Sequence, residues 1–89
     1  MLFEWDENKR QANIAKHGID FLDADQVIDA AHVLIPSDYG GSEPRWLAVG
    51  RIAGRYVTMI FTIRGEACRV ISMRRATNAE RRIYEDLHQ

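Results

Sequence analysis

Three segments in the second half of the chain alternate apolar and polar residues, and single glycines mark the breaks between them. The segments are Arg45–Ala53, Arg55–Ile63 and Ala67–Arg74, and the breaks lie at Gly54 and Gly65. Alternation with a period of two is typical of strands whose two faces differ in burial, and a glycine between such strands favours a tight turn. The pattern therefore predicts an antiparallel meander and restricts the chain to folds built on a small sheet.

The same alternation assigns side chains to the two faces of the expected sheet. In the middle strand one face carries Val57, Met59, Phe61 and Ile63, and the other carries Thr58, Ile60, Thr62 and Arg64. In the last strand, we expect Val70, Ser72 and Arg74 to share a face.

Helical patterns dominate the first half. The segment Asp6–His17 contains no glycine or proline and opens with a good cap residue, and Gly18 is placed to end the helix. Asp20 can cap a second helix over Phe21–Ala30, whose apolar residues recur at helical spacing.

Shorter signals surround these helices. Leu2–Trp5 is an expected edge strand, His32–Ile35 is a further short apolar run, and the turn-rich stretch Ser37–Pro44 is an expected exposed loop. Near the end, Thr77–Glu80 has the sequence of a capping box and predicts a last helix. The inward stripe expected for that helix consists of Ala79, Ile83 and Leu87.

This order of elements predicts an α+β fold, with helices packed on one face of a small antiparallel sheet. With 89 residues, we expect a single domain over residues 1–89. No apolar run approaches the roughly 20 residues that span a bilayer, and the charged N-terminus does not resemble a signal peptide. A single cysteine, Cys68, argues against disulfides, so we expect a cytoplasmic protein with no membrane partner.

Charge is distributed unevenly along the chain. Residues 1–44 carry three Lys or Arg and nine Asp or Glu, a net charge of −6, whereas residues 45–89 carry nine Arg and four Asp or Glu, a net charge of +5. One interpretation is an anionic partner for the second half. The other is that the acidic half packs beside the basic half, so that the two charges partly cancel.

Arginines gather where the expected strands end. Arg64 ends one strand, and Arg74 and Arg75 end the next and lead into the last helix. Guanidinium groups bind phosphate through paired donors, and a helix N-terminus adds unpaired N–H groups, so these residues are a candidate phosphate site. Arg81 and Arg82 are instead expected on a solvated helix face.

Two residues of the last helix have both a structural and a functional interpretation. Glu80 closes the capping box, but it is also a candidate for pairing with an arginine or for acid–base catalysis. Tyr84 can stack on an RNA base, although half-buried packing is the commoner role of such a tyrosine.

Lys16 and His17 form a second candidate pair at the end of the first helix. Cations there are stabilised by the helix dipole, which explains the pair by structure alone. Its functional interpretation is a phosphate ligand, with Lys16 binding the phosphate, or a general acid or base, for which His17 is the candidate. The histidines and acids show no metal-ligand spacing, so we expect neither a metal site nor any other cofactor.

Five segments carry a resemblance to a known family. They are Phe3–Lys9 (FEWDENK), Lys16–Phe21 (KHGIDF), Glu43–Arg45 (EPR), Gly54-Arg55 (GR) and Arg69–Glu85 (RVISMRRATNAERRIYE). Together they resemble the BrnT toxin family of type II toxin–antitoxin systems, almost from end to end.

The resemblance implies a RelE-like fold and a metal-independent endoribonuclease that blocks translation. In such enzymes the 2′-hydroxyl of the RNA is the nucleophile. The resemblance also implies a BrnA-type antitoxin, a DNA-binding dimer expected to form a heterotetramer with the toxin. Operator DNA would then be bound only through the antitoxin.

Position by position, the polar residues of the family fall on Lys16, His17, Arg64, Arg74, Arg75 and Glu80. Members of the family often carry an acid directly before the arginine of the T-x-R-G segment, where this chain has Ile63. Met73 replaces an alanine, which we expect to change only packing. The replacement at Ile63 leaves His17 and Glu80 as alternative proton acceptors.

Two other functions remain as alternatives. One is a catalytically inactive module of the same fold that only represses transcription together with an antitoxin. The other is a small DNA-binding regulator, which is disfavoured because the basic residues lie on strands and strand ends rather than on one recognition helix.

Overall fold

The computed structural model describes residues 1–37 and 42–88, so the middle of the loop expected at Ser37–Pro44 lies outside the described residues. The elements in chain order are β1 (Leu2–Glu4), α1 (Glu7–His17), the 3₁₀ turn η1 (Phe21–Asp23), α2 (Ala24–Ile28), β2 (Val33–Ser37), β3 (Arg45–Ile52), β4 (Arg55–Arg64), β5 (Ala67–Arg75) and α3 (Asn78–Leu87). The α+β class and the meander are confirmed. The second expected helix is shorter, because its first turn is a 3₁₀ turn and α2 ends at Ile28.

The five strands form one sheet in the order β1-β5-β4-β3-β2. The strands β2 to β5 pair antiparallel, but β1 runs parallel to β5, so the sheet is mixed and the expectation of a purely antiparallel sheet is wrong. β1 and β5 are separated in the chain by all the other strands, so the pairing of β1 with β5 leaves no local signal in the sequence. The short apolar run forms the strand β2, which continues through Pro36 to Ser37. A proline within this strand is tolerated because β2 lies at the edge of the sheet.

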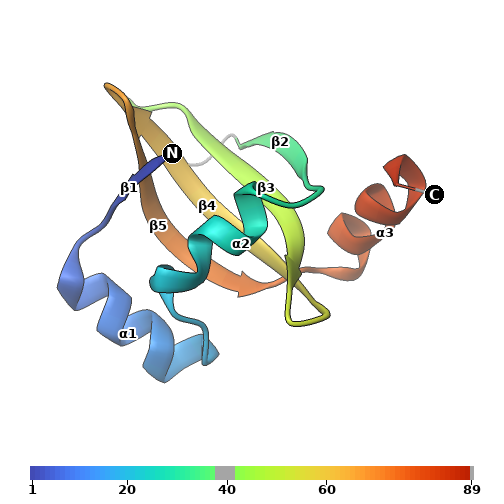
Figure 1. Cartoon of the computed structure of the whole chain (residues 1–89), viewed down its shortest axis with the longest axis horizontal. Helices are drawn as coiled ribbons and strands as arrows, with labels where there is room; N and C mark the ends of the chain where they lie inside the picture. Colours follow the sequence, from blue (N-terminus) through green and yellow to red (C-terminus); the bar gives the residue numbers. More distant parts are fainter. Residues whose placement is uncertain (38–41, 89) are drawn as a thin grey trace.

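The hydrophobic core lies between one face of the sheet and the segment that contains η1 and α2. Phe21 and Val27 are fully buried there against Met59 and Met73 of the sheet. Figure 1 shows α2 in front of the sheet and α1 below it, whereas α3 projects beyond its end.

The last helix does not join the other two on this face. Thr58 lies between the core residues Val57 and Met59, so its side chain points to the opposite face, where its hydroxyl donates to Glu80 of α3. The prediction that all helices cover one face is therefore wrong. The inward stripe predicted for α3 is also wrong: Ile83 and Leu87 are 40% and 66% exposed, and Ala79 is exposed too.

A β-bulge decides which residues of β5 face the core. Ile60 pairs with Ser72 but Phe61 pairs with Val70, so Ile71 is an extra residue in β5. The alternation shifts by one at this point, and Val70 and Met73 are both buried in the core. The expectation that Val70 shares a face with Arg74 is therefore wrong: Arg74 pairs with Thr58 and lies on the opposite face.

β1 pairs with only three residues of β5, Ala67 to Arg69. Further along the same strand, the side chain of Asn13 in α1 forms hydrogen bonds with the backbone of Met73. Its side-chain amide donates to the carbonyls of Met73 and Ile19, both at 2.9 Å, and its Oδ1 accepts from the Met73 amide at 3.2 Å. The side chain is buried, so these backbone groups have no alternative access to water.

We expect Asn13→Ala to lower the free energy of unfolding by about 3 kcal/mol, because it leaves two backbone groups of Met73 buried without partners. Chemical denaturation measures this. Gln11→Ala on the exposed side of α1 is the control and should change stability little. Equal effects of the two substitutions would contradict the role given to Asn13.

Candidate active site

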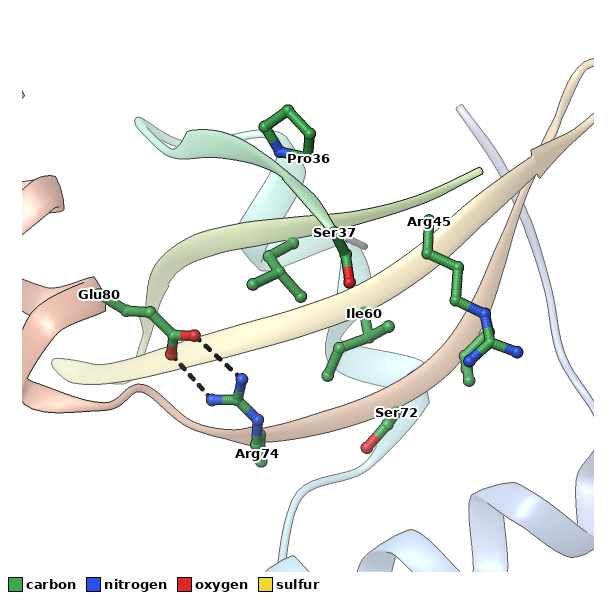
Figure 2. A pocket seen from close by; sticks show the side chains of 9 residues that line it. Pro36, Ser37, Arg45, Ile60, Ser72, Arg74 and Glu80 are labelled. Carbon is green, nitrogen blue, oxygen red and sulfur yellow. Dashed lines mark hydrogen bonds and ion pairs between the residues drawn. The ribbon is translucent and has the colours of Figure 1, made fainter. Parts of the chain in front are cut away.

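The face of the sheet opposite α1 and α2 holds a groove of about 590 Å³. Its walls come from four strands and the first turn of α3, and its polar side chains include Arg45, Arg74, Glu80, Ser37 and Ser72. Figure 2 shows Arg74 and Glu80 joined at one end of the groove and Arg45 at the other, with Ile60 between them.

Local structure places Arg74 and Glu80 at the same end of the groove. The bulge in β5 turns Arg74 toward this face, and the capping box begins α3 directly after β5. In that box the Thr77 hydroxyl accepts from the Glu80 amide at 3.2 Å, and the Glu80 carboxylate accepts from the Thr77 amide at 2.9 Å. The carboxylate is thereby fixed above the strand that carries Arg74.

Arg74 and Glu80 form a two-pronged ion pair. Nη1 of Arg74 lies 2.8 Å from Oε1 of Glu80, and Nη2 lies 3.0 Å from Oε2. Nη1 also donates to the Arg75 carbonyl at 3.2 Å. These contacts use three of the five N–H donors of a guanidinium, and the remaining two, on Nε and Nη2, lie side by side. Within residues 1–37 and 42–88, no other group occupies this second fork of Arg74, and its arrangement matches two oxygens of a phosphate.

The environment of Glu80 keeps its carboxylate ionised. The side chain is only 11% exposed, and it accepts from Arg74, from the Thr77 amide and from the Thr58 hydroxyl. The hydrogen bonds from Arg74 contribute most to lowering the pKa of Glu80, to about 2, with smaller contributions from Thr77 and Thr58. A carboxylate with so low a pKa accepts a proton poorly, so Glu80 is suited to orienting Arg74 rather than to proton transfer.

A smaller hollow of about 100 Å³ shares Arg45 and Ile71 with the groove, and its lining includes the side chains of Lys9, Glu43, Arg64 and Arg69. Arg64 donates to Glu43 from Nη2 at 2.8 Å and from Nε at 3.2 Å. The hydrogen bond from Arg64 lowers the pKa of the Glu43 carboxyl, and the charge of Arg45 lowers it further. The two hollows together form a basic surface along this face of the sheet.

The structure brings together some of the residues that the sequence predicts for a site. Arg74 and Glu80 share the groove, and Arg64 lies in the adjoining hollow. His17 and Arg75 instead line a separate cleft of about 210 Å³ beside the end of α1. Arg75 is there because it follows Arg74 on β5 and therefore points to the opposite face.

The other two predicted residues lie outside the groove. Lys16 is exposed on α1. The Tyr84 ring packs edge-to-face on Tyr56, with ring centroids 5.4 Å apart, and also contacts His88. These contacts correspond to the packing role rather than to base stacking.

Sequence reasoning missed Arg45, Glu43 and Lys9 as members of this surface. Glu43 and Arg45 belong to the E-P-R segment, whose only signal in the sequence is the resemblance to the family. Glu43 provides a carboxylate for Arg64 from a distant part of the chain, whereas Ile63 lines a separate apolar hollow on the other face of the sheet. Pairing across 21 residues has no local pattern, so only the motif itself was a signal.

Other chemistries depend on which side chains lie together or are exposed within residues 1–37 and 42–88. No three His, Cys, Asp or Glu side chains are gathered there as metal ligands. Cys68 is fully buried, and burial raises the pKa of its thiol to about 11, which disfavours a thiolate nucleophile. No helix within these ranges is long and apolar enough to cross a bilayer.

Comparison with protein families identifies the family. A sequence model described as the ribonuclease toxin BrnT of type II toxin–antitoxin systems matches residues 5–80. The chain belongs to the BrnT family. It is therefore a ribonuclease toxin, with RNA as target and an antitoxin protein as partner. No curated protein sequence matches the chain. The matched range includes both Arg74 and Glu80 of this BrnT-family toxin, but ends before Tyr84.

The ion pair makes a pH-dependent contribution to stability. We expect Glu80→Gln, which keeps a capping side chain but removes the charge, to lower the free energy of unfolding by about 2 kcal/mol near pH 7. The unfolded chain protonates Glu80 near its ordinary pKa, whereas the folded protein holds the charge down to about pH 2. The difference between wild type and variant should therefore shrink as the pH falls from about 5 to 2.

Denaturation curves across this pH range provide the measurement. Glu85→Gln, which removes an exposed i,i+4 partner of Arg81, is the control and should show a much smaller change. A difference between wild type and Glu80→Gln that stays constant with pH would show that the Glu80 charge does not contribute in this way.

Proposed function

We propose that the toxin cleaves RNA in the groove beside Arg74, by attack of the RNA 2′-hydroxyl and without a metal ion, and that this cleavage inhibits translation. The observation that carries the proposal is the guanidinium of Arg74, which is held by Glu80 on one side and retains a free fork of donors on the other. A RelE-like arrangement is part of the same proposal. The order of elements and the five-stranded sheet support it.

The reaction places its largest demand on the phosphate. The 2′-oxygen forms a bond to phosphorus as its proton passes to a water molecule, and the bond to the 5′-oxygen then breaks as that oxygen takes a proton from water. In between, the phosphorane carries one more negative charge than the diester. Donors fixed in advance where this charge develops stabilise the transition state by a few kcal/mol each.

Arg74 is positioned to make this contact, and Arg45 and Arg64 add positive charge along the same face. Glu80 acts through Arg74: its ion pair prevents the guanidinium from turning away and removes the entropic cost of ordering it. Because the pKa of Arg74 is raised by Glu80, the guanidinium stays charged throughout the reaction.

We expect Arg74→Ala and Arg74→Lys both to reduce RNA cleavage by about 10²-fold or more, because neither offers the fork of donors. Arg74→Lys keeps a cation beside Glu80, so its folding, checked by circular dichroism, separates a catalytic from a structural loss. The assay contains EDTA throughout, and wild-type toxin should remain active in it. The exposed Arg82→Ala is the control.

Three results would contradict the proposal. Full activity of Arg74→Lys would remove the donor fork from the mechanism. Loss of wild-type activity in EDTA, with recovery on adding Mg²⁺, would establish a metal requirement. Absence of cleavage by the wild type would favour the inactive module that only represses transcription with an antitoxin.

The position of His17 generates a separate prediction. His17 lines the cleft beside α1 and is not part of the groove lining, so we expect His17→Gln to retain cleavage within about tenfold, whereas loss of a general base costs about 10²–10⁴-fold. A loss of 10²-fold or more in His17→Gln would move the active centre to the cleft that His17 shares with Arg75.

The antitoxin is proposed to be of the BrnA type, assembled as a dimer that carries the toxin and contacts operator DNA. Its inhibitory segment is proposed to cover the groove, since Arg74, Arg45 and Arg64 attract acidic side chains as well as phosphates.

A further inference from the structure

A second basic pocket lies at the end of the sheet, between the β3–β4 hairpin and the beginning of α3. It has a volume of about 370 Å³, and Arg51, Arg55, Arg75 and Arg81 line it together with Tyr56. None of these residues lines the groove that holds Arg74. We call this site the hairpin pocket.

Two of the arginines flank the tight turn of the β3–β4 hairpin. Ala53 and Gly54 both have positive φ angles, 51° and 79°, as a two-residue turn of this kind requires. Arg51 pairs with Tyr56 across the hairpin and Ile52 pairs with Arg55, so Arg51 and Arg55 leave its end from opposite faces. Both line the hairpin pocket at this end of the sheet, and Arg51 donates to the Gly54 carbonyl at 3.3 Å.

Tyr56 orders two of the guanidinium groups. The Arg81 guanidinium lies 4.6 Å from the centre of the Tyr56 ring, and that of Arg51 lies 5.2 Å from it. Tyr84 supports the same ring from its edge. Cation–π contacts of this kind hold cations in place without neutralising them, so the pocket is arranged before any ligand arrives.

The balance of charge separates the hairpin pocket from the groove. In the groove and its adjoining hollow, Arg74, Arg64 and Arg69 each pair with a glutamate. Among the described residues, only Arg81 of the hairpin pocket has an acidic partner, Glu85 at 3.4 Å. Four guanidinium groups around one pocket repel one another, and a bound anion relieves that repulsion.

The chemistry of the lining indicates which anion. Apart from the arginines and Tyr56, the lining consists of glycine, alanine and asparagine, with no aliphatic side chain larger than that of Ala76. A protein segment depends on buried apolar anchors for affinity, which this pocket does not offer. A phosphodiester backbone needs only cations and N–H donors.

The hairpin pocket and the groove lie on either side of one short segment. Arg74 faces the groove and Arg75 the opposite face, and α3 contributes Glu80 to the groove and Asn78 and Arg81 to the hairpin pocket. A strand bound at Arg74 therefore needs to pass only the first turn of α3 to reach the hairpin pocket.

We propose that the hairpin pocket binds the phosphate backbone of substrate RNA that extends beyond the cleaved bond. The proposal rests on the proposed function, because it takes RNA bound at Arg74 as given. The hairpin pocket then supplies affinity for long RNA, while the groove supplies the chemistry.

Binding of non-cleavable 2′-O-methyl RNA, measured by fluorescence anisotropy, tests this. Oligonucleotides of about four and about fourteen nucleotides differ in whether they can occupy both sites. We expect the wild type to bind the longer one more tightly by at least tenfold, and Arg55→Glu to lose most of that gain. The affinity of Arg55→Glu for the longer RNA should also depend less on salt than that of the wild type: the slope of log K against log salt concentration should be smaller by about one unit. Arg82→Glu changes the same charge on the exposed face of α3 and should keep the gain.

The double substitution Arg51→Ser with Arg55→Ser provides a second test without introducing a negative charge, and circular dichroism checks its fold. It should lose the length-dependent gain as Arg55→Glu does. If Arg55→Glu and Arg82→Glu respond alike to RNA length, the hairpin pocket does not bind RNA. The same conclusion follows if Arg55→Glu weakens only antitoxin binding.

These failures are distinct from a failure of the proposed function. Loss of the proposed function appears as wild-type toxin that cleaves no RNA, or as cleavage that is indifferent to Arg74. An error confined to the hairpin pocket leaves wild-type cleavage and its dependence on Arg74 intact.

Discussion

The carboxylate of Glu80 is the interaction on which both the last helix and the groove depend. It accepts hydrogen bonds from β4 through Thr58, from β5 through Arg74 and from the start of α3 through the Thr77 amide. α3 buries no apolar stripe; this polar junction and the contact of Tyr84 with Tyr56 attach it to β4 and β5, and it also lies beside β2 and β3. A nearly buried carboxylate is costly unless every side of it is satisfied, and here the donors that satisfy it also position the helix and orient the guanidinium.

The bulge at Ile71 is the second condition for the groove. With a strict period of two, Arg74 would share a face with Val70 and point toward the core side of the sheet, where it would find neither Thr58 nor Glu80. One extra residue in β5 moves Arg74 to the outer face and leaves Val70 and Met73 in the core. A single inserted residue thus allows β5 to direct Val70 and Met73 into the core and Arg74 into the groove.

The sequence predicts those features that local chemistry determines. Asp6 and Gly18 bound α1, the capping box starts α3 and the meander breaks at its glycines, because each depends on residues a few positions apart. The pairing of β1 with β5, the face that α3 occupies and the bulge depend on contacts between distant segments, and no periodicity records them. The sequence therefore predicts a phosphate site from the neighbouring arginines. It does not predict that Arg74 and Arg75 lie in different hollows, because that depends on the bulge and on the face that α3 occupies.

The two interpretations of the uneven charge apply to different sets of arginines: the structure shows the pairing of the two halves for one set, and an anionic partner for the other set is part of our proposal. Glu4 and Glu43 of the acidic first half pair with Arg69 and Arg64 of the basic second half, so the two halves do neutralise each other along the groove. Such pairing orders a guanidinium but weakens its long-range attraction for an anion. Arg51, Arg55 and Arg75 line the hairpin pocket and have no acidic partner among the described residues, so their charge is available to attract an anion. A surface with both kinds of arginine can attract a polyanion at one place and fix a single phosphate at another, which is the division of tasks that cleavage of a long RNA requires.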